Sequence, residues 1–289
     1  MLNTHNKNTI DANNLYQQHK RRLDGISSSK KLLDLMLEIQ RHRAASLASL
    51  GGDLFFENRL FNIQKTTKQH LVELSHNREK LLTEQELRQL NGEWVTIRSQ
   101  WQKDSVMQNF LLHSHLINLI LKINNDISTR AGHTLLDSQH QALAHYCLND
   151  LPRLIEAAAQ ARGLATHCAA QKTNSDKIMS KIKYLIDEIK ALDSKSQATV
   201  VQCSAENYRI IQHTRATNSS QRHMDIFIQQ LKSHFTEHDT PELFSDEIYT
   251  TGSQFIMATY DVLLRTYKLM GKSIDGDMQE WIYRSSYNS

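Results

Sequence analysis

The sequence predicts an all-α protein, an antiparallel helical bundle that forms either one long bundle or, as we prefer, two stacked four-helix bundles that share long helices. Its 289 residues include only 2 Pro and 9 Gly, whereas a sheet protein needs many more of these residues for its turns. Apolar residues recur at steps of three and four along most of the chain, which is the period of a helix that buries one face. Helix caps and stops divide this pattern into roughly eight helices.

The first third of the chain holds a long stretch of apolar periodicity. After an expected flexible tail at residues 1–10, the helical pattern continues, as one helix or as two divided at 25–29, to the Gly51–Gly52 pair. Glycine at this place stops a helix because it readily adopts the left-handed conformation of a C-terminal cap. A second helix is expected over 54–80.

Capping residues mark the next helices. Thr83 and Glu86 have the spacing of a capping box, in which each side chain bonds the backbone N–H of the other residue. An apolar helix is expected over 105–132, opened by a serine. Asp150 followed by Pro152 resembles an N-cap with proline in the first turn, where the missing N–H costs nothing.

The remaining chain is divided by similar signals. Its helices are expected over 151–171, 175–217, 220–237 and 240–270. The last of these opens on Thr240–Pro241 and is stopped by Gly271. Residues 11–271 are therefore expected to form one helical domain, followed by an aromatic C-terminal tail at 272–289.

The composition argues against several classes of partner and compartment. With 34 Lys+Arg against 31 Asp+Glu, the net charge of +3 does not predict binding to nucleic acid or to an anionic membrane. The N-terminal segment is polar and has no apolar core of a secretion signal. The most apolar stretch, 110–123, is shorter than the ~18 residues of a membrane span. Three widely spaced cysteines in no CxxC pattern indicate a reducing compartment, so we expect a cytoplasmic protein without a membrane span.

Two arginines occupy positions on apolar stripes. In the first stripe Arg43 follows Met36 by one heptad, which places it only about 20° further round the helix. In the second stripe Arg162 follows Ile155 at the same spacing. Both guanidinium groups are therefore expected to point into the bundle.

A buried guanidinium needs acceptors or a counter-anion, because an unpaired charge in a protein core is very unfavourable. Small residues follow both arginines, within a faint internal repeat in which 39–47 resembles 158–166. They leave room for a planar oxyanion held by forked N–H donors. The alternative from the residues alone is that each arginine pairs with a buried Glu or Asp, or reaches the edge of the bundle.

Two segments that carry these arginines resemble a known family. IQRHRAASLASLGGDLFFENRLFNIQ, residues 39–64, resembles the opening signature of nitrate- and nitrite-sensing (NIT) domains, an RGxS-like pattern. LPRLIEAAAQARGLATHCAA, residues 151–170, resembles the second arginine-bearing helix of that family, with Arg162–Gly163 matching its Arg-Gly pair. The resemblance extends over residues 30–270. In the first motif Ala44 stands where the family usually has glycine.

The resemblance implies two stacked up-down four-helix bundles with nitrate or nitrite bound between helices by arginines. It assigns ligand-binding roles to Arg43, Ser46, Arg162 and Gly163. Members of the family usually carry an attached output module. In this chain we expect the signal to pass instead to a separate output protein, a regulator or a kinase, or to a change of assembly such as a homodimer.

Other residue patterns indicate neither a metal site nor an enzyme. His113 and His115 are two apart, so on a helix they point about 200° away from each other, and the sequence contains no HExxH motif. Cys147 and Cys168 lie among apolar residues, where cysteine is usually buried and unreactive. The sequence contains no GxSxG motif, phosphate loop or dinucleotide fingerprint. We therefore expect no cofactor, no metal and no catalytic residues.

These observations lead to one hypothesis and its alternatives. In the first, nitrate or nitrite bridges Arg43 and Arg162, draws two helices together and shifts the packing of the bundle toward a state that a partner recognises. In the second, the chain is a ligand-free helical scaffold or adaptor that mediates protein–protein interaction, and both arginines are paired inside the protein. A third interpretation is a sensor that has lost its output domain.

Overall fold

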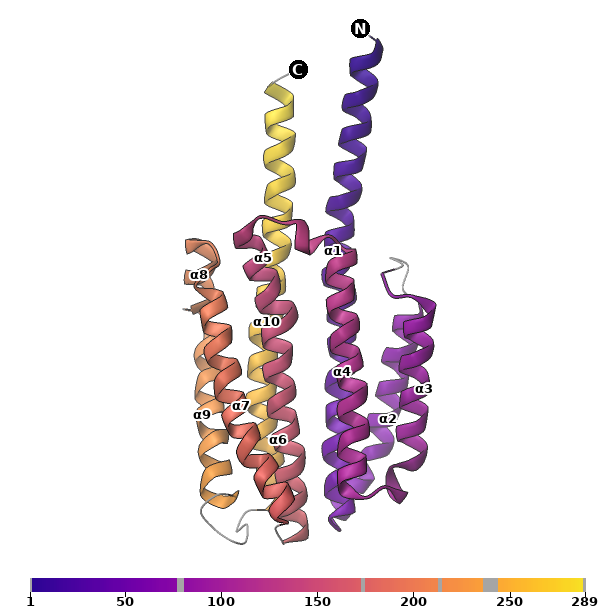
Figure 1. Cartoon of the computed structure of the whole chain (residues 1–289), viewed down its shortest axis with the longest axis vertical. Coiled ribbons are helices and arrows are strands. Elements are labelled where there is room, and N and C mark those ends of the chain that lie inside the picture. Colours follow the sequence, from indigo (N-terminus) through magenta and orange to yellow (C-terminus); the bar gives the residue numbers. More distant parts are fainter. Residues whose placement is uncertain (1, 77–80, 173–174, 213–214, 236–243, 288–289) are drawn as a thin grey trace.

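The computed structural model describes residues 2–76, 81–172, 175–212, 215–235 and 244–287, with side chains described between residues 12 and 285 except at 215. All regular elements in these ranges are helical, so the predicted all-α class is confirmed. The long helices form two antiparallel four-helix bundles that lie side by side (Figure 1).

The first bundle contains the segment that holds Arg43. It is formed by α1 (Leu2–Leu50), α2 (Leu54–Ser75), α3 (Glu84–Gln100) and α4 (Val106–Arg130). The expected stop after α1 is confirmed, because Gly52 adopts a φ of 95° that a side chain would oppose. α1 runs without a break through 25–29, so the single-helix alternative holds.

Capping fixes the entries of α3 and α4 as the sequence predicts. The Thr83 hydroxyl accepts from the backbone N–H of Glu86 at 3.2 Å, and the Glu86 carboxylate accepts from the backbone N–H of Thr83 at 2.8 Å. Ser105 caps α4 by accepting from the backbone N–H of Gln108 at 3.3 Å. Each cap satisfies a backbone donor that the first helical turn leaves without a partner.

The second bundle is formed by α6 (Leu151–Gln171), α7 (Asp176–Val200), α9 (Arg215–Phe235) and α10 (Ser245–Tyr287). The short helices α5 (Ser138–His145) and α8 (Ala205–Gln212) lie at the end of this bundle that is uppermost in Figure 1.

Three predicted boundaries in this half of the chain are wrong, and the first is the start of the helix expected over 220–237, which begins at Arg215. Asp150 does not cap α6, because it is helical itself, and a π-helical turn over Tyr146–Asp150 joins α5 directly to α6. The wider turn accommodates Pro152, which has no N–H to donate. The helix expected over 175–217 is two helices, because the chain leaves the helix after Val200 and the Ser204 hydroxyl then accepts from the N–H of Asn207 at 3.2 Å.

The terminal boundaries also differ from the prediction. The tail expected at 1–10 continues α1, which begins at Leu2, and the tail expected at 272–289 continues α10, which passes through Gly271 and ends at Tyr287. A helix that is already formed gains a backbone hydrogen bond with each added residue, and one internal glycine costs only about 1 kcal/mol. The two extensions leave the bundle at the same end (Figure 1), where His19 Nε2 lies 3.3 Å from Asp275 Oδ1. The cap expected at Thr240–Pro241 lies outside the described residues.

α1 is the member of the first bundle that also packs against the second. It packs against α2 and α4 on one side and against α6 and α10 on the other, and one cluster of buried apolar residues extends through both bundles. The side chains near the middle of this shared interface are the ones that the sequence singles out.

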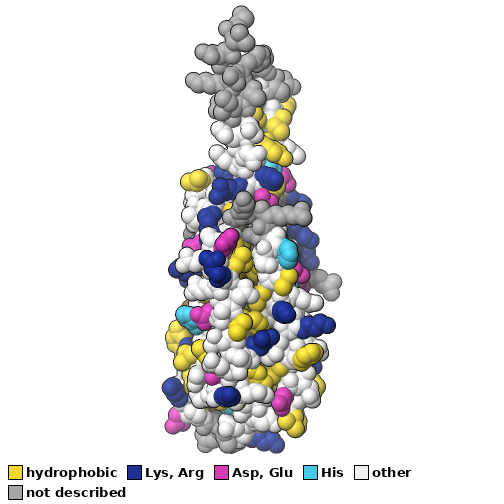
Figure 2. Space-filling view, turned by 90° about the vertical axis from the view of Figure 1, so that its right-hand side faces the viewer, with side chains coloured by type: hydrophobic (Ala, Val, Ile, Leu, Met, Phe, Trp, Pro, Cys, Tyr) yellow, Lys and Arg dark blue, Asp and Glu magenta, His cyan; other side chains and the backbone are white. Residues whose placement is uncertain are grey.

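The outer surface carries mixed charge. Figure 2 shows the face at the right of Figure 1, on which Lys and Arg side chains are spread among acidic and hydrophobic ones instead of gathering into one basic field. Within the described ranges, no helix combines the length and the apolar character that crossing a membrane requires.

Candidate functional site: two buried arginines between the bundles

Arg43 of α1 is fully buried between α4 and α6. Its Nη1 donates to Oε1 of Glu156 at 2.7 Å and its Nη2 donates to Oε2 at 3.0 Å, which makes a bidentate ion pair. Nη1 also donates to the Ser114 hydroxyl at 3.1 Å, and the guanidinium carbon lies 5.6 Å from the centre of the Phe110 ring. The prediction that Arg43 points into the bundle is confirmed, and Glu156 is its counter-charge.

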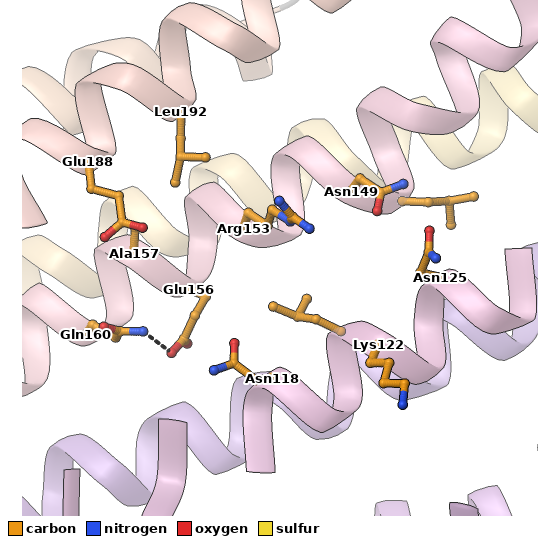
Figure 3. Close-up of a pocket in the computed structure, with 12 residues that line it drawn as sticks. Asn118, Lys122, Asn125, Asn149, Arg153, Glu156, Ala157, Gln160, Glu188 and Leu192 are labelled. Carbon is orange, nitrogen blue, oxygen red and sulfur yellow. Dashed lines mark hydrogen bonds between the residues drawn. The ribbon is translucent and has the colours of Figure 1, made fainter. Parts of the chain in front are cut away.

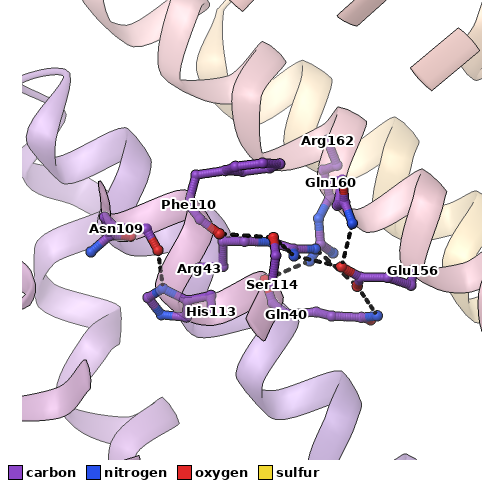
Figure 4. A network of polar contacts seen from close by, with 9 residues as sticks. All are labelled: Gln40, Arg43, Asn109, Phe110, His113, Ser114, Glu156, Gln160 and Arg162. Atoms are coloured by element: carbon purple, nitrogen blue, oxygen red, sulfur yellow. Dashed lines mark hydrogen bonds and ion pairs between the residues drawn. The ribbon is translucent and has the colours of Figure 1, made fainter. Parts of the chain in front are cut away.

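The Glu156 carboxylate accepts four N–H donations (Figure 4). Besides the two from Arg43, it accepts from Gln40 Nε2 at 2.8 Å and from Gln160 Nε2 at 2.9 Å. A forked guanidinium supplemented by amide donors is the arrangement that holds a planar carboxylate or oxyanion most firmly. α1 and α6 therefore build a small anion cradle whose occupant in this structure is a side chain of the protein.

Arg162 of α6 is buried as predicted, but its partners are neutral. Nη1 donates to the Ser253 hydroxyl at 2.8 Å, and Nη2 donates to the backbone oxygen of Gln40 at 3.1 Å. The guanidinium carbon lies 4.8 Å from the centre of the Tyr249 ring. Among the described residues no carboxylate pairs with Arg162, and its Nε–H has no hydrogen-bond partner.

The two arginines are electrostatically coupled. Burial lowers the pKa of Arg162 to about 10; the positive charge of Arg43 acts in the same direction, while Tyr249 and Glu156 act against it. Gln40 links the two groups, because its backbone oxygen accepts from Arg162 while its side chain donates to Glu156 (Figure 4). A buried cation that has only neutral partners is poorly compensated for its lost hydration. This part of the core therefore favours a further negative group.

Two glycines allow helices to approach around the arginines. A Cβ added to Gly252 of α10 would lie 2.9 Å from Cγ of Arg162 and 3.0 Å from Cε2 of Phe227. A Cβ added to Gly163 would lie 3.3 Å from Cδ1 of Leu47, in the contact between α1 and α6. Gly163 therefore serves the approach of the two helices that carry the arginines.

Ser46 takes part in a neighbouring set of polar contacts. Its hydroxyl lies 2.9 Å from Oδ1 of Asn109 and 3.1 Å from the backbone oxygen of Arg43, two acceptors for its one proton. Of the four predicted ligand-binding residues, the structure thus joins Arg43 and Arg162 in one network. It places Gly163 in helix packing and Ser46 against α4.

A chain of hydrogen bonds runs beside the arginine pair through two buried histidines. His113 Nδ1 lies 2.7 Å from the backbone oxygen of Asn109, which can only accept, so this nitrogen carries the proton. His113 Nε2 must then accept from His42 Nδ1 at 2.8 Å, and His42 Nε2 accepts from the amide of Gln64 at 3.1 Å. Both rings are satisfied in their neutral forms.

Burial keeps these histidines neutral. It lowers the pKa of His113 to about 3, and the nearby Arg43 charge acts in the same direction. Burial also holds the pKa of His42 well below its usual value, with a further contribution from His113. Two tryptophan rings enclose His42 edge-on, with centroids 5.0 Å away for Trp94 and 6.4 Å away for Trp101.

A polar groove opens on the other side of Glu156. It has a volume of about 510 Å³, lies between α4, α6 and α7, and is shown in Figure 3. Glu156 and Gln160 line it, together with two exposed cations, Lys122 of α4 and Arg153 of α6. Glu156 therefore stands between the groove and Arg43.

Glu156, the acceptor of the site, is not predicted from the sequence. Glu156 is the only acidic residue in the segment 151–170, and it lies four residues before Gln160 on the same helix face. The signal that could have found it is an acidic residue among apolar ones, about one and a half helical turns before the buried Arg162. The pairing itself depends on how α1 crosses α6, which no local pattern encodes.

Other reactive groups in the described part of the chain are isolated. No cluster of three metal-ligating side chains is found there. Burial raises the pKa of Cys147, and raises it to about 12 for Cys168 and to about 11 for Cys203, so little of any thiol is ionised near neutral pH.

Comparison of the chain with protein-family models, with curated proteins and with solved structures gave no match. The resemblance to NIT domains therefore rests on the sequence alone, and it stays a prediction.

Proposed function

We propose that the protein senses a small planar oxyanion, with nitrate or nitrite as the ligand that the motif resemblance suggests. The observation that carries the proposal is Arg162, a buried guanidinium with neutral partners and an Nε–H that lacks an acceptor within the described residues. An anion that contacts both Arg43 and Arg162 supplies the negative partner that Arg162 lacks.

Binding at this place acts on the interface between the bundles. Arg43 belongs to α1 of the first bundle and Arg162 to α6 of the second, while Ser253 extends the contacts to α10. An anion shared by the two guanidiniums favours the arrangement in which these helices are closest, to the extent of its differential affinity for the two states. We propose a separate regulator or kinase in the cytoplasm as the partner that recognises this arrangement, with a homodimer as the alternative output.

The alternative function, a ligand-free scaffold or adaptor, is favoured by one observation. It predicts that both arginines are paired internally, and Arg43 is paired with Glu156. Arg162 does not fit it, because a scaffold has no need of a buried guanidinium without a carboxylate.

Isothermal titration of the full chain with nitrate, nitrite, sulfate and chloride at matched ionic strength tests the proposal. The expected result is saturable heat with nitrate or nitrite and none with chloride. The variant Arg162→Gln should lose this heat while circular dichroism still shows the helical fold. Arg98→Gln, which removes an exposed arginine of α3, is the matched control and should bind as the parent does. Absence of heat for all four anions would leave the scaffold as the better account.

A further inference from the structure

We infer that Glu156 is an internal mimic of the ligand, which occupies the oxyanion site on Arg43 and moves into the neighbouring groove when the anion binds. This inference rests on the proposed function and assigns its regulation to one side chain.

The cradle around Glu156 suits any planar group with two oxygens on one edge. Arg43 supplies two parallel N–H donors, and Gln40 and Gln160 each supply one more. None of these four donors requires the bound oxygens to belong to a side chain. A small oxyanion in the same position keeps all four hydrogen bonds.

A trigonal anion offers one contact that the carboxylate does not. Both oxygens of Glu156 are already engaged by Arg43, Gln40 and Gln160. Nitrate has a third oxygen, and the neighbouring Arg162, which Gln40 links to the cradle, has an Nε–H with no acceptor among the described residues. The anion therefore competes with the tethered carboxylate through Arg162, and this gives the second arginine a role in selecting the ligand.

The groove provides a place for the displaced carboxylate. Glu156 already lines the groove, so reaching it requires rotation of the side chain and no movement of α6 (Figure 3). Arg153 lies three residues earlier on α6, which places it one turn away on the same face. It is exposed in the groove and forms no ion pair with any described residue, and Lys122 faces the groove from α4.

The exchange makes a two-state element. In one state Glu156 neutralises Arg43 and the site is closed to anions; in the other the anion holds Arg43 and Glu156 pairs with Arg153 at the surface. Without ligand the open state leaves the buried Arg43 guanidinium unpaired, and the exposed Glu156–Arg153 pair offsets little of that cost, so the closed state predominates. The apparent affinity for the anion is reduced by the small population of the open state.

Titration calorimetry with nitrate on the full chain tests this inference. Glu156→Gln removes the competitor and is expected to raise nitrate affinity roughly tenfold or more, since the cost of displacing a charged group disappears. Glu188→Gln is the matched control, because Glu188 lines the same groove but does not contact Arg43, and it should change affinity by less than about twofold. Arg153→Gln removes the cation that pairs with the displaced Glu156 carboxylate and should weaken nitrate binding, whereas Arg153→Lys keeps the charge and should preserve it.

The outcomes separate the inference from the proposed function. If the parent chain binds nitrate and Glu156→Gln binds it equally or more weakly, the gating role is wrong and the sensor stands. If neither the parent nor Glu156→Gln binds, the proposed function itself fails. If Glu156→Gln does not fold, Glu156→Asp replaces it, because the shorter side chain keeps the charge but holds Arg43 less well. It should then bind nitrate more tightly than the parent does.

Discussion

The Glu156 carboxylate meets the Arg43 guanidinium edge to edge, with N–O distances of 2.7 and 3.0 Å, in the interface between the two bundles. The pair joins the first helix of one bundle to the first long helix of the other. It is buried on both sides, since the side chains of Arg43 and Glu156 are 0% and 6% exposed. In the proposed function, its strength decides how readily an anion displaces Glu156.

Breaking this pair from one side should destabilise the protein strongly. Arg43→Gln leaves the Glu156 carboxylate buried without a cation, and we expect a loss of about 3 to 5 kcal/mol in the free energy of unfolding. The double variant Arg43→Met/Glu156→Met should recover most of this loss, because it removes both charges and keeps the volume. Urea unfolding of the two variants and the parent checks this. A double variant as unstable as the single one would show that the charge pair is not the cause.

A side chain at Gly252 should lower the stability of the folded protein. Gly252→Ala places a methyl group 2.9 Å from Cγ of Arg162 and 3.0 Å from Phe227, and we expect a loss of about 1 to 3 kcal/mol of stability through overpacking. Gly276→Ala in the same helix meets no atom within 4 Å and should stabilise by about 0.5 to 1 kcal/mol through helix propensity. Thermal unfolding of both variants measures the contrast. Equal effects would mean that α10 does not pack closely on Arg162.

The two buried histidines should make the protein acid-sensitive. The pKa of His113 falls from its usual 6.5 to about 3 in the folded protein. Between these two pH values the histidine is protonated in the unfolded chain and neutral in the folded chain. The contribution of these histidines to the free energy of unfolding is therefore fully present above pH 6.5. It declines as the pH falls toward 3, with a slope of up to about 1.4 kcal/mol per pH unit for each such histidine.

Urea unfolding between pH 7.5 and 5 measures this slope. His113→Gln keeps a donor and an acceptor but cannot titrate, so its stability should fall less steeply than that of the parent. His115→Gln, which changes an exposed histidine two residues away, should leave the slope unchanged. Parallel curves for the parent and His113→Gln would show that His113 is not held neutral by the fold.

Arg162 should set the preference among anions. Because nitrate has a third oxygen for the Nε–H of Arg162 and nitrite does not, we expect the parent to bind nitrate more tightly. Arg162→Met should weaken nitrate binding more than nitrite binding and so remove the difference between them. Thermal shift at matched ionic strength provides the measurement, since saturation at 100 times Kd stabilises a protein by about 2.7 kcal/mol. An unchanged nitrate preference in Arg162→Met would place the selective contact elsewhere.

The sequence predicts the parts of this structure that depend on local chemistry. The Gly51–Gly52 stop, the capping box at Thr83 and the burial of Arg43 and Arg162 all follow from residue type and helical period, and the structure confirms them. The π-helical turn before Pro152 was not predicted, because it depends on a helix continuing through a residue that usually begins one.

The pairing of Glu156 with Arg43 could not be predicted from local sequence patterns for a similar reason. Glu156 and Arg43 are 113 residues apart, and their pairing requires α1 to cross α6 near Gly163. The pattern of residues in each helix indicates which face is buried. It does not indicate which buried groups of two helices meet.

A crystal structure of the full chain grown with nitrate tests the central claim most directly. The account predicts a planar trigonal ligand against Arg43 with its third oxygen toward Arg162, and a Glu156 carboxylate that has turned into the groove beside Arg153. Glu156 still paired with Arg43 at saturating nitrate, with no ligand between the arginines, would contradict it.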